Sequence, residues 1–188
     1  MKFDISEIDN EDVTGLGQRG IADLVEYGVS AIASKTNFGA GWEYFEPRSK
    51  RSPEDFALKH EDGRVIYYDV KTHDVDGEFC MPNLVSLDRA RKIVQSDVDM
   101  IYIFVKYKVT SGILKIIDVQ FIPLYKIAMS SIEIQNLGLG VLQIKNAHNP
   151  IDFYSESRDN WLQELNKKAI GFYSKQITKF ERLRAQYE

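Results

Sequence analysis

The stretch 64-RVIYYDVKTHD-74 constrains the fold more than any other part of the chain. Residues 65–70 are rich in branched and aromatic side chains, which are typical of a strand inside a sheet. Asp69 and Lys71 interrupt this apolar character, and the period-2 alternation of a strand places them on the same side. The sequence therefore predicts a buried strand that carries a carboxylate and an ammonium together near its end.

Hydrophobic periodicity predicts helices and further strands around this stretch. Helical spacing occurs over residues 18–36, in a helix opening at Pro82-Asn83, and in a long C-terminal helix with Ser157 as its N-cap. The other predicted strands are 42–45, 55–59, 100–105 and 113–122, and one continuous apolar stripe is predicted for the C-terminal helix through Trp161, Leu165, Ala169, Phe172, Ile177, Phe180 and Leu183. This order predicts an α/β (α+β) fold with a mixed central sheet flanked by helices. No linker interrupts residues 1–188, so we expect one domain.

Composition and charge leave a nucleic-acid partner open. The net charge is −4, but residues 1–12 carry all of that excess, and basic clusters occur at 48–51 and 89–92. Cys80 is the only cysteine, which excludes an intrachain disulfide framework and a cysteine-rich zinc site. There is no apolar run long enough for a membrane helix and no signal peptide, so we expect a cytoplasmic protein with no membrane partner.

The chemistry is predicted from Asp69 and Lys71 together with Asp55, fourteen residues before Asp69. The Asp62-Gly63 pair is a strong hairpin signal, and a hairpin would bring the two strands side by side. Two carboxylates are suitable ligands for Mg²⁺, and a nearby lysine can orient or deprotonate a water molecule. The alternative is an ordinary salt bridge at the end of a strand.

These residues lie in a pattern that resembles a known nuclease signature. The segments 53-PEDFALK-59 and 68-YDVKT-72 resemble the PD-(D/E)xK motif, with Pro-Glu-Asp in place of Pro-Asp. The inserted Glu54 leaves open which acid binds the metal. More narrowly, the chain resembles type II restriction endonucleases of the EcoRV/HincII blunt-cutting group, whose first-helix glutamate is matched by Glu26, twenty-nine residues before Asp55.

Two further blocks extend the resemblance. Those enzymes continue from D-V-K-T to a Pro-Asn pair, matched here by Pro82-Asn83, and 157-SRDNWL-162 resembles the end of the same enzymes. The blocks occur in the right order and are scattered over most of a chain that is shorter than theirs. The resemblance implies a restriction-endonuclease-like core and cleavage of double-stranded DNA.

The resemblance also implies a role for each catalytic residue. Asp55 and Asp69 would bind Mg²⁺, with the Val70 carbonyl as a third ligand, and Lys71 would serve the attacking water. Glu26 would be a second acid near the metal; the alternative is a solvated glutamate on a helix face.

Two segments are candidates for contacts with DNA. For Asn83 the resemblance implies a contact in the minor groove, although an asparagine before an apolar run also suits a helix N-cap. Cys80 and Met81 would precede it on a loop that faces DNA, where a side chain can press on base steps; the alternative for Cys80 is a place in the core.

The second candidate segment, 143–149, follows a glycine-rich stretch and is predicted to form a recognition loop. Lys145, Asn146, His148 and Asn149 can all hydrogen-bond to base edges, although loops are commonly polar for solubility alone. None of the three histidines has a partner at metal-binding spacing, so we expect them to be surface or hydrogen-bonding residues.

The sequence therefore predicts a Mg²⁺-dependent type II restriction endonuclease that acts as a homodimer on a short, palindromic DNA sequence. The first helix or the C-terminal helix would form the dimer interface. Two alternatives remain: a repair or junction-resolving nuclease with the same fold, and a DNA-binding module without catalysis.

Overall fold

The computed structural model describes residues 1–47, 49, 52–77 and 81–187. All three basic residues in 48–51 and the predicted DNA contact Cys80 lie outside the described residues. The elements in chain order are η1 (Ser6–Ile8), α1 (Gln18–Lys35), β1 (Trp42–Phe45), β2 (Phe56–His60), β3 (Val65–Asp74), β4 (Asn83–Ser86), α2 (Leu87–Gln95), β5 (Val98–Thr110), β6 (Ile113–Pro123), η2 (Leu124–Lys126), β7 (Ile132–Gln135), β8 (Val141–Ile144) and α3 (Arg158–Arg184).

The central sheet has five strands in the order β1-β2-β3-β5-β6. Strands β3 and β5 are parallel, because β4 and α2 carry the chain across between them, and the other pairs are antiparallel. The predicted mixed α/β fold with a long C-terminal helix is therefore confirmed. The Asp62-Gly63 turn joins β2 to β3 as expected, with Gly63 at a positive φ of 93°.

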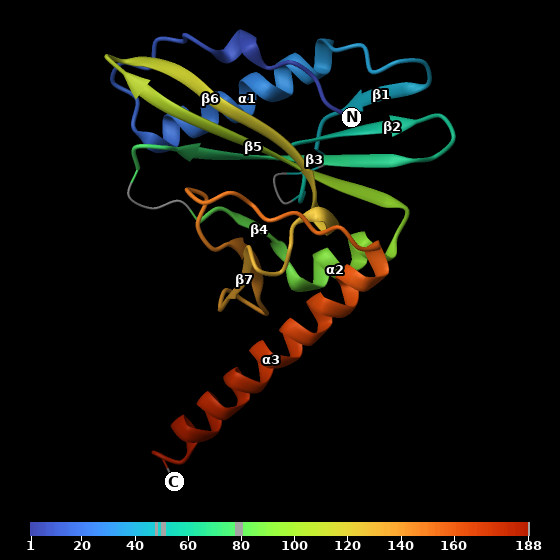
Figure 1. The fold of residues 1–188 in the computed structure, drawn as a ribbon, viewed down its shortest axis with the longest axis vertical. Helices are drawn as coiled ribbons and strands as arrows, with labels where there is room; N and C mark the ends of the chain where they lie inside the picture. The colour runs from blue at the N-terminus through green and yellow to red at the C-terminus, as the bar shows by residue number, and fades with distance from the viewer. Residues whose placement is uncertain (48, 50–51, 78–80, 188) are drawn as a thin grey trace.

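The two faces of the central sheet pack against different layers (Figure 1). Helix α1 covers one face with buried Ile21, Val25 and Val29, which join Tyr68 and Val70 of β3 in one hydrophobic cluster. On the other face, a second cluster joins β5 to α2, α3 and a small sheet. Since alternate β3 residues point to opposite faces, Asp69 and Lys71 point away from α1 and toward the small sheet.

The small sheet has three strands in the order β4-β8-β7, and it corrects two predictions. Asn83 begins strand β4 instead of capping a helix; Ser86 is the N-cap of α2, accepting a hydrogen bond from the Arg89 N–H at 3.4 Å. The apolar residues after Asn83 match a helical phase, but Leu84 is buried in the sheet. Residues 141–144 form β8, so segment 143–149 is a loop only from residue 145 onward.

Helix α3 begins as predicted, because the Ser157 hydroxyl accepts a hydrogen bond from the Asn160 N–H at 3.1 Å. Trp161 is fully buried, and its indole N–H donates to the Ile127 carbonyl at 2.8 Å. The predicted apolar stripe is buried only in the first half of the helix: Ile177, Phe180 and Leu183 are exposed. There α3 projects away from the rest of the molecule (Figure 1).

Candidate active site

The β2–β3 hairpin brings Asp55 to the level of Asp69. The two strands are antiparallel with Phe56 opposite Tyr68, and Asp55 directly precedes β2. The Asp55 N–H donates to the Tyr68 carbonyl at 2.7 Å, and Asp55 Oδ2 accepts a hydrogen bond from the Val70 N–H at 2.6 Å. The backbone of β3 thus fixes the orientation of the Asp55 carboxylate.

Asp69 and Lys71 form a close ion pair on the same side of β3. Lys71 Nζ lies 2.6 Å from Asp69 Oδ1, and Asp69 is only 6% exposed. Burial raises the pKa of Asp69 from 3.8 to about 7, although the charge of Lys71 acts in the opposite direction. The ion pair therefore compensates only part of the cost of burying this carboxylate.

The Asp55 carboxylate adds to that cost. Its charge raises the pKa of Asp69 further, and so does a hydrogen bond that requires a proton between the two carboxyl groups. Two carboxylates this close cannot both be ionised cheaply without a positive charge beside them. A divalent cation at this position would replace the proton and remove the repulsion.

The donor set accordingly fits a hard cation. Asp55 and Asp69 offer carboxylate oxygens, and the Val70 carbonyl belongs to the segment between Asp69 and Lys71. In the part of the chain that the structure describes, no group of three or more His, Cys, Asp or Glu side chains is placed to hold a metal ion. A cation held here by two carboxylates and one carbonyl would complete its coordination with water.

Glu26 of α1 is electrostatically coupled to the same site. Its pKa is raised, first by burial and then by the charge of Asp55, while the charge of Lys71 lowers it. The half-buried position is not that of a freely solvated glutamate. The structure therefore places Glu26 within electrostatic range of Asp55 and Lys71.

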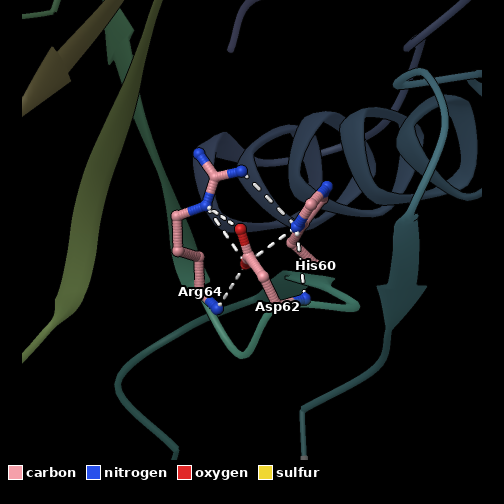
Figure 2. A network of polar contacts seen from close by, with 3 residues as sticks. All are labelled: His60, Asp62 and Arg64. Atoms are coloured by element: carbon pink, nitrogen blue, oxygen red, sulfur yellow. Dashed lines mark hydrogen bonds and ion pairs between the residues drawn. The ribbon is translucent and has the colours of Figure 1, made fainter.

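The opposite end of the hairpin carries a separate polar network. Figure 2 shows Asp62 between His60 and Arg64: its carboxylate lies 2.7 Å from His60 Nδ1 and 2.8 Å from Arg64 Nε. These contacts join the residues on both sides of the Asp62-Gly63 turn. Since the turn sets the register between β2 and β3, they support the alignment of Asp55 with Asp69.

The small sheet joins the two segments predicted to contact DNA. Asn83 of β4 pairs with Gln143 of β8, and Gln143 Nε2 donates to Asn83 Oδ1 at 3.0 Å and to the Met81 carbonyl at 2.9 Å. Asn83 is exposed, and Met81 is 43% exposed. Residues sixty positions apart therefore form one surface.

The turn after β8 presents the other predicted residues. Lys145, Asn146, His148 and Asn149 are exposed, and Asn146 Oδ1 accepts a hydrogen bond from the His148 N–H at 2.9 Å. This contact gives the turn a defined conformation.

Sequence reasoning missed two residues beside the site. His73 of β3 is 5% exposed, and its Nε2 lies 3.2 Å from His148 Nδ1, so the turn after β8 contacts the strand that carries Asp69 and Lys71. Tyr102 of β5 is fully buried opposite Asp69, and burial, followed by the charge of Asp69, raises its pKa well above 10. Only the strand register and the tertiary contact reveal these two positions.

No model of a protein family matches the chain, and no curated protein matches it. Among solved structures, the chain is similar to the NlaIV restriction endonuclease, with a TM-score of 0.56, 15% sequence identity and coverage of 81% of this chain. The match spans 65% of that protein, so less than two thirds of its length. The chain thus has a restriction-endonuclease-like fold. No helix among the described residues has the length and apolar character needed to cross a membrane.

Proposed function

We propose that the chain is a Mg²⁺-dependent type II restriction endonuclease that hydrolyses phosphodiester bonds in a short, specific DNA duplex sequence. The observation that carries this proposal is the pair of carboxylates from half-buried Asp55 and buried Asp69, with Lys71 only 2.6 Å from Asp69. A salt bridge that served only stability would gain little from a second acid beside it, since the added negative charge increases the cost of burial. The similarity in fold to the NlaIV restriction endonuclease supports the same reading.

Each residue of the site has a separate role in the proposed reaction. Asp55 and Asp69 would hold Mg²⁺ with the Val70 carbonyl, and when bound the ion neutralises negative charge that develops on the scissile phosphate. Lys71 would orient the attacking water and accept its proton or stabilise the transition state. Val70 also holds Asp55 through its N–H, so the ligands are positioned before the substrate arrives.

The small sheet would read the DNA sequence. Asn83, Lys145, Asn146, His148 and Asn149 can donate or accept hydrogen bonds at base edges, and all are exposed. Met81, with the preceding Cys80, would press on base steps in the minor groove. A palindromic site requires two centres related by a twofold axis, so a homodimer would cut both strands, with the blunt-cutting EcoRV/HincII group as the pattern.

The test is incubation of the purified protein with unmethylated plasmid and phage DNA, with Mg²⁺ or with EDTA. We expect discrete fragments in Mg²⁺, none in EDTA, and a loss of about 10²–10⁴-fold in rate for Lys71→Ala, as expected for removal of a general acid–base group. Lys115→Ala is the matched control, because Lys115 lies on the outer strand β6 and contacts Asn10. It should cleave like the wild type.

The pattern of cleavage separates the alternatives. Cutting only at branched or damaged DNA would identify a structure-specific nuclease. DNA binding without cleavage under every metal condition, with Asp69→Asn binding equally well, would identify a non-catalytic module and refute the proposal.

A further inference from the structure

The second half of α3 carries the largest collection of exposed apolar side chains in the described structure. We define the apolar arm as residues 170–184 together with two leucines of the β7–β8 turn; its exposed apolar residues are Leu137, Leu139, Ile170, Tyr173, Ile177, Phe180 and Leu183. The two parts are joined, because the Tyr173 hydroxyl donates to the Leu139 carbonyl at 2.6 Å. An apolar surface of this extent usually marks an interaction site.

The spacing within the arm fits another helix. Ile170, Tyr173, Ile177 and Phe180 follow at intervals of three, four and three residues, which are the a and d positions of a heptad repeat. The core does not explain this stripe, since Ile177 is 57% and Phe180 is 62% exposed. A seam of this kind buries its side chains in the gaps between residues of a facing helix.

The charges indicate which partner the seam accepts. In this heptad the positions that flank the seam hold Ser174, Gln176, Glu181 and Leu183, and one base, Arg184, takes the next a position at the end of the helix. Lys175, Lys179 and Arg182 all occupy the outer positions. An acidic peptide or an anionic membrane would be favoured by bases along the edges of the apolar stripe. Two copies of this helix that pair in antiparallel orientation instead keep their Arg184 residues at opposite ends of the seam.

The exposed apolar area of the arm is also large enough for a dimer interface. Seven large apolar side chains that each offer roughly 100 Å² would bury about 700 Å² per chain, near the ~800 Å² per partner of a standard interface. We infer that the apolar arm is the homodimer interface, with the arm of a second copy as its occupant. The choice of a second copy as the occupant rests in part on the proposed function, because that function needs two catalytic centres. Of the two helices predicted as possible interfaces, α3 is therefore selected over α1.

The test measures assembly and not cleavage. Sedimentation equilibrium of the full chain, without DNA and without Mg²⁺, should give twice the chain mass of 21.6 kDa at micromolar concentration. Ile177→Lys should raise the dimer dissociation constant on the order of a hundredfold, because the charge enters the seam from both copies. Thr178→Lys is the matched control, since it places the same side chain at the next residue, outside the seam, and should leave the dimer unchanged.

A variant outside the helix excludes a local loss of helix as the cause. Leu139→Glu changes only the turn, and Leu139 is 82% exposed, so the monomer should fold normally by circular dichroism while the dimer weakens. A wild-type monomer at all concentrations, or a dimer that withstands both Ile177→Lys and Leu139→Glu, would overturn the inference. Equal weakening by Thr178→Lys would overturn it as well. A dimer without nuclease activity would refute only the proposed function.

Discussion

Replacing Asp69 by asparagine tests whether the buried carboxylate is costly to the metal-free fold. Burial raises the pKa of Asp69 from 3.8 to about 7. Between these values the native state binds more protons than the unfolded state, so the free energy of unfolding decreases as the pH rises. The full difference corresponds to about 4 kcal/mol, because each pKa unit is worth 1.36 kcal/mol.

About 3 kcal/mol of this difference falls between pH 5 and pH 8, since at pH 5 the native carboxyl is still almost fully protonated. We therefore expect the unfolding free energy of the wild type, relative to Asp69→Asn, to fall by about that amount over this range. The comparison between two pH values removes constant effects of the substitution, including the loss of the Lys71 partner. Adding Mg²⁺ at pH 8 should restore stability to the wild type alone, because binding to the native state is stabilising.

The assay is urea unfolding in EDTA, followed by the fluorescence of the buried Trp161, with equal m-values required for the comparison. Asp88→Asn is the matched control: Asp88 pairs with Lys92 at the same 2.6 Å, but on the exposed surface of α2. It should change stability by less than about 1 kcal/mol at either pH. If the difference in unfolding free energy between the wild type and Asp69→Asn stays constant from pH 5 to pH 8, the reasoning is refuted.

Two further predictions address the surroundings of the site. Burial and the charge of Asp55 raise the pKa of Glu26, so Glu26→Gln should lower the plasmid cleavage rate about tenfold and shift the Mg²⁺ dependence to higher concentration, as expected for a residue that supports the metal ligands. An unchanged Mg²⁺ titration would identify Glu26 as a helix-face residue. Burial and the charge of His148 lower the pKa of His73 below 6.5, so its contribution to stability is fully present above pH 6.5 and is lost as the pH falls through the lowered pKa. In urea unfolding, His73→Gln should flatten the decline below pH 6.5; an equally steep decline in this variant would contradict the assignment.

Local sequence was sufficient for the part of the site that lies on one hairpin. A turn signal at Asp62-Gly63 and the alternation of β3 fix the relation of Asp55, Asp69 and Lys71, because all three depend on contacts within a short segment. The same reasoning failed for Asn83. The apolar residues after Asn83 match a helical spacing, but they form strand β4, in which Leu84 is buried. The pairing partner β8 lies about sixty residues further along the chain, so local sequence does not reveal it.

The surface that we propose for reading DNA therefore depends on contacts between distant parts of the chain. The hairpin that carries Asp55 and Asp69 depends on local sequence. Gln143 illustrates this: it begins the predicted recognition loop 143–149, yet it lies in β8, and its Nε2 donates to Asn83 Oδ1 and to the Met81 carbonyl. Its side chain is thereby bound within the small sheet, whereas Lys145, Asn146, His148 and Asn149 beyond Ile144 are exposed. Because His148 of that turn contacts His73 of β3, the surface that we propose for DNA is connected to the strand that carries Asp69 and Lys71.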